Sequence, residues 1–162
     1  MTSDILVKRL FTTNLLSTGR QWRRAVDTAL GQHGISEALA APLIWISRLG
    51  DGVRQIVVAS HVGIEGPSLV RLLDQLELLG LVVRKDDPDD RRAKGLWLTD
   101  EGKALATRLE EVIDDLRERI LRDIDKADLE AAVRVLRAFD ALGTSKDMGT
   151  SKAADTKTEA AL

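Results

Sequence analysis

The stretch from residue 65 to residue 98 constrains the fold most, because a helix there runs directly into a β-hairpin. Leucines recur at three- and four-residue spacing up to Gly80, which is typical of an amphipathic helix that ends at a glycine. Two short apolar runs, 81–84 and 95–98, then predict strands, and the charged segment 85–94 between them must lie in solvent. The expected buried face of the helix consists of Leu69, Leu72, Leu73, Leu76 and Leu79.

Three further helices are expected before this stretch. The first covers about residues 4–32 and ends near Gly34, which suits a left-handed C-terminal cap. The second begins at a cap formed by Ser36 and runs to about Leu49. A short third helix spans about 54–59, and a tight connector that contains glycine joins it to the leucine helix.

Two more helices follow the hairpin. Thr99 or Asp100 caps a long one with apolar residues at coiled-coil-like spacing, and Asp125 caps the last. From Gly143 onward large apolar residues are almost absent, which predicts a disordered tail. The predicted fold is mainly α with a small β-wing, a winged helix-turn-helix. The first and last helices carry more apolar surface than the central module can cover, which predicts a homodimer held by these arms.

Composition removes several classes of function. The chain has no cysteine, which excludes disulfides and thiolate chemistry, and its two histidines, His33 and His61, lie too far apart in sequence to suggest a zinc site. No group of residues indicates a catalytic nucleophile, a metal site or a cofactor site, so we do not expect an enzyme. Because a signal-peptide pattern and an apolar run of about 20 residues are both missing, we expect a cytoplasmic protein with no membrane partner.

Charge gives weaker guidance about the partner. The formal net charge is -2, whereas strong DNA binders are often basic. Between residues 53 and 94, seven Lys and Arg residues balance seven Asp and Glu residues. A neutral module can still bind DNA if its cations share one face, so net charge alone does not decide whether the chain binds nucleic acid.

Residues 62–77 closely resemble the recognition helix of the MarR family of transcriptional regulators, and most nearly that of its SlyA-like branch. The wing pattern of this family follows at matching spacing, and further matches lie upstream. Together the resemblance extends over about residues 5–142. The matching positions after the recognition helix are Gly80, Leu81, Val82, residues 90–94, Leu98, Thr99 and Gly102, and the upstream ones are Arg20, Trp22, Arg23, Gln55 and Ile56.

The resemblance implies a homodimer bound to a pseudo-palindromic DNA site. It also implies a repressor or anti-repressor role, often with release from DNA by small phenolic or carboxylate ligands. Combined with the expected elements, it divides the chain into four parts. These are an N-terminal dimerisation helix (1–34), a winged helix-turn-helix DNA-binding module (35–99), C-terminal dimerisation helices (100–142) and a disordered tail (143–162).

The start of the leucine helix suits entry into the major groove of DNA. The side chains at this end are small, because the helix begins with Gly66, Pro67 and Ser68. The backbone amides of the first turn favour binding of a phosphate. Arg71 lies one turn further along the same face, where its guanidinium can pair with guanine. The alternative interpretation of Arg71 is an ordinary exposed charge on a helix.

The charged hairpin tip supplies a second candidate contact. The resemblance implies that one arginine enters the minor groove while Asp90 holds it, and the family spacing favours Arg92 over Arg91 without deciding between them. Lys85 and Lys94 are expected to contact phosphates. The alternative is a solvated charge run that touches no DNA. The full set of candidate DNA-contacting residues is Arg54, Gln55, Gly66, Pro67, Ser68, Arg71, Lys85, Asp90, Arg91, Arg92 and Lys94.

A cleft between the helical arms and the DNA-binding module is a candidate ligand site. Cations there would bind a carboxylate, and aromatic side chains would stack on a ring. Alternatively, the two tryptophans among the candidates are ordinary core or interface residues. The candidate lining residues are Arg20, Trp22, Arg23, His33 and Trp45.

The sequence thus favours a transcription regulator whose partners are double-stranded DNA, a second copy of the chain and a small aromatic acid. The rival hypothesis is a winged-helix module that binds another protein and has lost its affinity for DNA. The acidic balance of the chain is consistent with this rival.

Overall fold

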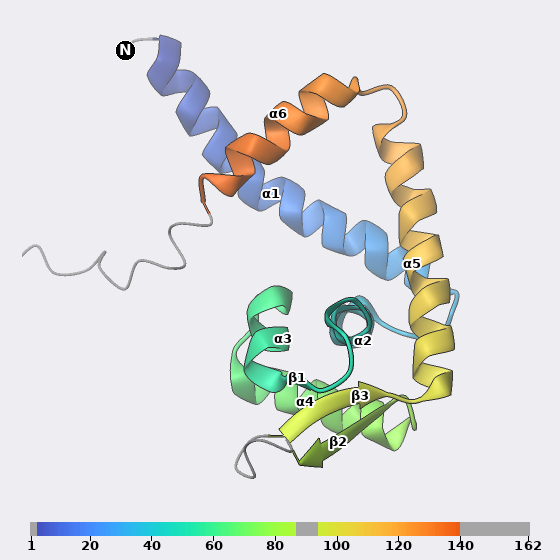
Figure 1. Ribbon diagram of the computed structural model, residues 1–162. Helices are drawn as coiled ribbons and strands as arrows, with labels where there is room; N and C mark the ends of the chain where they lie inside the picture. Colours follow the sequence, from blue (N-terminus) through green and yellow to red (C-terminus); the bar gives the residue numbers. More distant parts are fainter. Residues whose placement is uncertain (1–2, 87–93, 140–162) are drawn as a thin grey trace, which may run out of the picture. The chain divides into compact units, whose positions relative to one another are not determined.

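The computed structural model describes residues 3–86 and 94–139 of the chain. The chain divides into two compact units, residues 1–120 and 121–162. The elements of the first unit are α1 (Ser3–Gly31), α2 (Glu37–Leu49), β1 (Val53–Arg54), α3 (Gln55–Val62), α4 (Gly66–Leu78), β2 (Val82–Asp86), β3 (Lys94–Leu98) and α5 (Asp100–Leu121), which ends at the boundary (Figure 1). The second unit contains α6 (Lys126–Arg137).

The predicted fold class is confirmed, because the structure is mostly helical with one small antiparallel sheet. Local chemistry explains where the first helices begin and end. Gly34 follows α1 with a φ of +72°, in the left-handed conformation that glycine adopts without strain. The Ser36 hydroxyl accepts a hydrogen bond from the amide of Leu39 at 3.4 Å, so it caps α2 as predicted.

The sheet has three strands in the order β1-β3-β2, one more than the sequence predicted. The extra strand pairs Val53 with Leu96 and Arg54 with Gly95. Two residues are too few to show an alternating pattern, which is why β1 could not be predicted. The consequence is that β3 is a central strand, bound on one side to the two residues that directly precede α3 and on the other to β2.

The third helix is longer than predicted. It continues through His61 and ends at Val62, and Gly63 caps it with a φ of +74°. The His61 ring lies 4.6 Å from the ring of Trp45, and its Nδ1 atom is 2.8 Å from the carbonyl oxygen of Val57. His61 is therefore part of the packing between α2 and α3.

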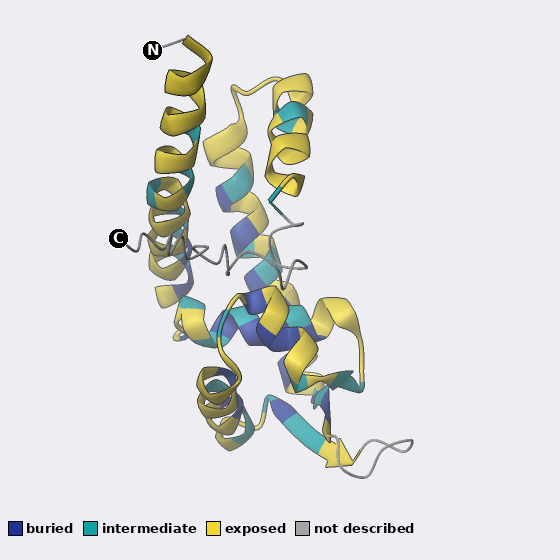
Figure 2. Ribbon diagram, turned by 90° about the vertical axis from the view of Figure 1, so that its left-hand side faces the viewer, coloured by how far each residue is buried: buried dark blue, intermediate teal, exposed yellow. Residues whose placement is uncertain are grey.

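The core of the first unit surrounds α2, which packs against α1, α3, α4 and β3. Buried segments gather around this helix in Figure 2. Leu69, Leu73 and Leu76 of α4 are at most 1% exposed, as their spacing predicted. Leu79 was wrongly assigned to this buried face. The helix ends at Leu78, so Leu79 leaves the helical stripe and is 59% exposed.

A tight junction joins the wing to α5. The Thr99 hydroxyl donates to the carbonyl of Gly80 at 2.7 Å and accepts from the amide of Gly102 at 3.0 Å. Thr99, rather than Asp100, is therefore the capping residue. The Thr99 amide also donates to the carbonyl of Leu81 at 3.1 Å. The start of α5 is thus fixed to the backbone that leads into β2.

Large apolar side chains are exposed on the first half of α1, which is largely yellow in Figure 2. The exposed side chains there are Ile5, Leu6, Val7, Leu10 and Leu16. In the second unit, Asp125 stands at the N-cap of α6 without a side-chain capping bond, and Val133, Val135 and Leu136 are exposed. The predicted tail from residue 143 lies outside the described residues.

Among the described residues, no single helix is long and apolar enough to cross a membrane. Taken together, α3 and α4 have the length and apolar composition of a membrane-spanning segment, but the chain bends by 105° between them.

Candidate DNA-binding surface and ligand pocket

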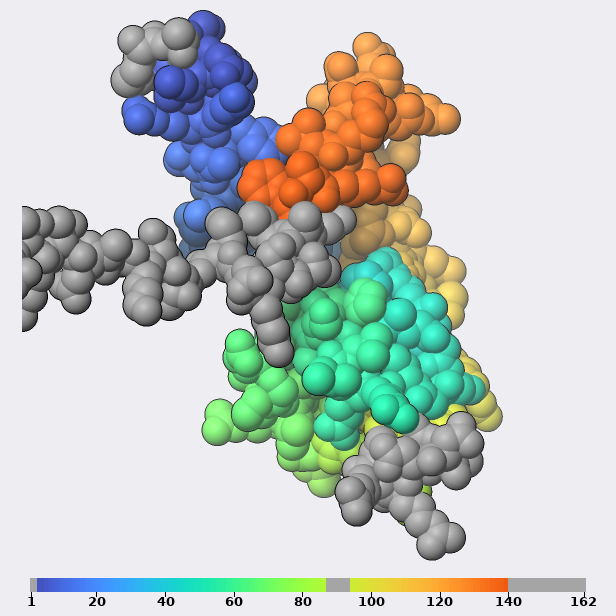
Figure 3. Space-filling view, turned by 60° about the vertical axis from the view of Figure 1, so that its left-hand side comes forward, coloured from blue at the N-terminus to red at the C-terminus, as the bar shows by residue number. Residues whose placement is uncertain are grey.

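Helices α3 and α4 form a helix-turn-helix, with a bend of 105° between them. The turn between them contains only residues 63–65. Its start is held against the end of α3, because the amides of Gly63 and Ile64 both donate to the carbonyl of Ala59, at 2.9 and 3.1 Å. Figure 3 shows these two helices at the surface of the first unit. The buried leucine face of α4 fixes which of its sides is turned outward.

The outward side of α4 carries Ser68 and Arg71, and both are exposed. The first turn offers fewer amides to a phosphate than expected. The amides of Ser68 and Leu69 donate to the carbonyl of Glu65, at 3.0 and 3.1 Å, and Pro67 has no N–H. Phosphate binding at this end would therefore depend on the amide of Gly66.

The two strands of the wing place their cations at the surface. Lys85 is exposed, and its Nζ lies 5.4 Å from the centroid of the Trp97 ring, which holds the lysine stem against the sheet. Lys94 is exposed as well and pairs in register with Asp86. The tip residues Asp90, Arg91 and Arg92 lie outside the described residues.

Two other candidates lie beside the helix-turn-helix. Arg54 is exposed in β1, and Gln55 begins α3 half-buried. Arg54 also makes an interaction within the chain, so it is not a free cation. The predicted DNA-contacting residues that the structure describes thus come from β1, the start of α3, α4 and the two wing strands.

One cation of the module is turned away from solvent. Arg84 in β2 is only 16% exposed, and its guanidinium binds Asp74 and Glu77 of α4 at 2.7 Å each. The even balance of charge counted from the sequence therefore overstates both the free cations and the free acids near α4.

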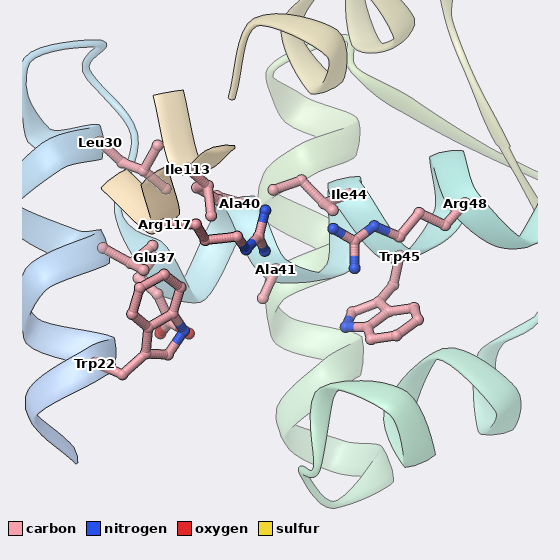
Figure 4. A pocket seen from close by; sticks show the side chains of 11 residues that line it. Trp22, Leu30, Glu37, Ala40, Ala41, Ile44, Trp45, Arg48, Ile113 and Arg117 are labelled. Carbon is pink, nitrogen blue, oxygen red and sulfur yellow. The ribbon is translucent and has the colours of Figure 1, made fainter. Parts of the chain in front are cut away.

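A pocket of about 210 Å³ lies between α1, α2 and α5 (Figure 4). It brings together two predicted residues from different helices, Trp22 and Trp45. Apolar atoms from all three helices form much of its wall. The lining residues are Trp22, Val26, Leu30, Glu37, Ala40, Ala41, Ile44, Trp45, Arg48, Ile113 and Arg117.

The other three predicted ligand residues lie elsewhere. Arg20 is exposed on α1 and does not line the pocket. Arg23 points toward α2 and α3, with its Nε 3.5 Å from a Glu37 carboxylate oxygen and its Nη2 3.4 Å from the carbonyl of Val62. His33 lines a separate, open hollow beside Asp115 and Arg119.

The pocket cations are instead Arg48 and Arg117, which the sequence analysis missed. The Arg48 guanidinium lies 5.1 Å from the centroid of the Trp45 ring, and Arg117 lies 5.8 Å from that of Trp22. Figure 4 shows the two guanidinium groups reaching into the pocket from opposite sides. Arg117 occupies the charged side of a helix, which by sequence pattern alone indicates solvent.

Arg48 is held in place by a bidentate contact. Its Nε and Nη2 donate to the two carboxylate oxygens of Glu110 at 2.6 and 2.7 Å. This hydrogen bonding to Glu110 raises the pKa of Arg48, and burial partly offsets the effect. The pair also ties α2 to α5 along the pocket wall.

Comparisons with known proteins agree with this geometry. A sequence model of the MarR family matches residues 34–93. The transcriptional regulator PA3341 is 37% identical over 83% of this chain and 99% of its own, with a TM-score of 0.77. A MarR family regulator from Rhodococcus sp. RHA1 is 28% identical over 82% and 93% of the two chains, with a TM-score of 0.73.

A third relative, CouR from Rhodococcus jostii RHA1, has been solved bound to p-coumaroyl-CoA. It is 30% identical over 85% of this chain and 92% of its own, with a TM-score of 0.68. CouR, a transcriptional repressor, has also been solved on a 23-mer DNA duplex, with a TM-score of 0.67. The helix-turn-helix, the wing strands and these relatives together show that the chain belongs to the MarR family of DNA-binding transcriptional regulators.

Proposed function

We propose that the chain binds a pseudo-palindromic operator as a homodimer, with α4 in the major groove and the wing tip in the adjacent minor groove. The exposed apolar side chains of α1 and of α6 would be covered by a second copy. On the residues matched upstream and in the recognition helix, we assign the chain to the SlyA-like branch. We also propose a cytoplasmic location, because a regulator that binds an operator must share a compartment with the DNA.

The observation that carries this proposal is the orientation of α4. The face of α4 formed by Leu69, Leu73 and Leu76 is buried in the core. Ser68 and Arg71 are exposed and lie outside this face, so they are turned outward. A hydroxyl followed one turn later by a guanidinium is a suitable donor set for base edges in the major groove. The CouR complex with a DNA duplex supports the same use of this fold. A protein-binding module without DNA affinity is not favoured by these relatives.

The test is DNA binding measured by fluorescence anisotropy at two salt concentrations. The duplex comes from upstream of the gene for this protein, and a scrambled duplex of equal length is the control. We expect preference for the native duplex and a loss of affinity with salt of about 0.9 log units per decade for each phosphate neutralised.

Equal affinity for both duplexes, or a flat salt response, would contradict the proposed interface. Light scattering on the same sample tests the dimer, for which we expect a mass near twice the 17.8 kDa of one chain.

We also propose that the pocket binds a small aromatic carboxylate that weakens DNA binding. Two indole rings can stack on an aromatic ring, and the two guanidinium groups of Arg48 and Arg117 can bind a carboxylate. Drug-sized ligands occupy pockets of roughly 300–1,000 Å³, so a cavity of about 210 Å³ suits a single-ring acid. The p-coumaroyl-CoA complex of CouR supports an aromatic effector.

The ligand must bind one conformation better than another to act as an effector. Because α2 lines the pocket and also packs against α3 and α4, a ligand that shifts α2 would change the separation of the two recognition helices in a dimer. A separation that no longer matches the operator would release the protein from DNA.

Tryptophan fluorescence measures this binding directly, because two of the three tryptophans line the pocket. Titration with salicylate should quench the fluorescence and release the labelled duplex. Arg117→Met should weaken salicylate binding roughly tenfold, the scale of one charge-assisted hydrogen bond. Arg119→Met, on the same helix but outside this pocket, is the matched control. If salicylate and related acids neither quench nor release DNA, the effector proposal is wrong.

A further inference from the structure

We infer that Arg84 is a positioning residue that sets the rotation of the recognition helix α4 about its own axis, relative to the wing. This inference rests on the proposed role of α4 in DNA binding. Arg84 belongs to β2, yet among the described residues the acceptors that its guanidinium binds all belong to α4. It is therefore a direct link between the two parts of the molecule that are proposed to enter neighbouring grooves.

The contacts of Arg84 extend along one side of the helix. Nη1 donates to Asp74 Oδ1 and to Glu77 Oε2 at 2.7 Å each, and Nη2 donates to the carbonyl of Val70 at 3.2 Å. Positions 70, 74 and 77 are four and three residues apart, so they form one row on the helix surface. A group that binds three points in one row resists rotation of the helix as well as sliding.

The link is reinforced at the backbone. Glu77 accepts through Oε1 from the amide of Arg84 at 3.0 Å, so its two carboxylate oxygens bind the main chain and the side chain of one residue. Arg71 directly follows Val70 in α4. Any rotation of α4 that breaks the Arg84 contacts would therefore swing Arg71 around the helix axis and away from its base.

Position in the strand separates Arg84 from its cationic neighbour. Successive side chains of a strand point to opposite faces. Arg84 faces α4 and is 16% exposed, whereas Lys85 is exposed and lies over the Trp97 ring. We therefore assign phosphate contact to Lys85 and a positioning role to Arg84.

The test is the Arg84→Lys variant, which keeps the charge but replaces a planar fork with a single ammonium that cannot reach all three acceptors. The probes are a duplex that the wild-type chain selects from a random-sequence pool and a scrambled duplex. We expect the affinity for the selected duplex to fall about tenfold, with the scrambled duplex and the salt slope unchanged. A second variant, Arg84→Met combined with Asp74→Asn, has the same net charge as the wild type. It should lose the same affinity for the selected duplex as the Arg84→Lys variant.

Two results of the DNA-binding assay would overturn the inference. One is an unchanged ratio between selected and scrambled DNA. The other is equal weakening on both duplexes with a salt slope reduced by about 0.9, because Arg84 would then be an ordinary phosphate contact.

Amide hydrogen exchange tests Arg84 without DNA and separates this inference from the proposed function. We expect faster exchange in α4 of the Arg84→Lys variant, while α1 and α5 keep the protection that they have in the wild type. Unchanged exchange in α4 would also overturn the inference. Failure of the wild-type chain to bind any duplex would instead contradict the proposed function alone.

Discussion

Replacing Gly102 by alanine should destabilise the protein by about 3 kcal/mol, at the upper end of the cost of overpacking. A Cβ at this position would lie 2.0 Å from the carbonyl oxygen of Leu81 and 3.0 Å from its carbonyl carbon. Backbone atoms cannot move aside as a flexible side chain can, and the Leu81 carbonyl is already hydrogen-bonded to the amide of Thr99. The start of α5 would have to move away from the wing.

Thermal unfolding followed by circular dichroism measures this effect. At about 2–4 °C per kcal/mol for a chain of this size, the melting temperature should fall by roughly 6–12 °C. Gly19→Ala is the matched control, because Gly19 is also helical and nothing lies within 4 Å of the place that its new methyl group would occupy. It should stabilise the protein by about 0.5–1 kcal/mol. Equal melting temperatures for the two variants would contradict the packing described at Gly102.

Truncating Arg71 to alanine should weaken binding to the selected duplex by about 1–3 kcal/mol, or roughly 5- to 150-fold. The reason is that a guanidinium reading a guanine edge forms two hydrogen bonds that no other side chain in α4 can replace. Binding to scrambled DNA should change little, and the salt slope should stay constant, because a base contact releases no counterion. Anisotropy titrations at two salt concentrations give both quantities.

The control for Arg71 is Arg108→Ala, which removes one exposed cation from α5. We expect this variant to bind the selected duplex within about twofold of the wild type, since distant surface charges act weakly through salt. Equal behaviour of the Arg71→Ala and Arg108→Ala variants would mean that Arg71 is only an exposed helix charge, the alternative that the sequence left open.

Periodicity and capping chemistry predicted the larger elements well. The buried leucines of α4 are three and four residues apart, and Ser36 caps a residue three positions further along the chain. Over such short separations the local sequence largely determines the structure. The pattern failed where an element is very short or depends on a distant partner. β1 has two residues and exists only because it pairs with β3, more than forty positions away in the chain.

The candidate pocket shows the same division. Trp22 and Trp45 were two of five candidates chosen by residue type, and both line the pocket, but the cations beside them were not predicted. Arg48 is fixed by Glu110, 62 positions further along the chain, and this pairing leaves no local pattern. Arg84 entered the charge count simply as one of seven cations, because its acceptors on α4 become visible only when the strand lies against the helix.

The three helices that form the pocket wall differ in how closely they pack against α3 and α4. This difference affects how the ligand specificity of related regulators can diverge. The wall formed by α2 also supports α3 and α4, so a substitution at Ala40 or Ile44 changes the core beneath the DNA-reading helices as well as the fit of a ligand. Trp22 and Arg117 belong to α1 and α5. In the described part of the chain these two helices contact α3 and α4 far less than α2 does, for example through the hydrogen bond from Arg23 of α1 to the Val62 carbonyl of α3. New ligand preferences should therefore arise during divergence mainly by changes on these two helices, while the α2 wall stays the same.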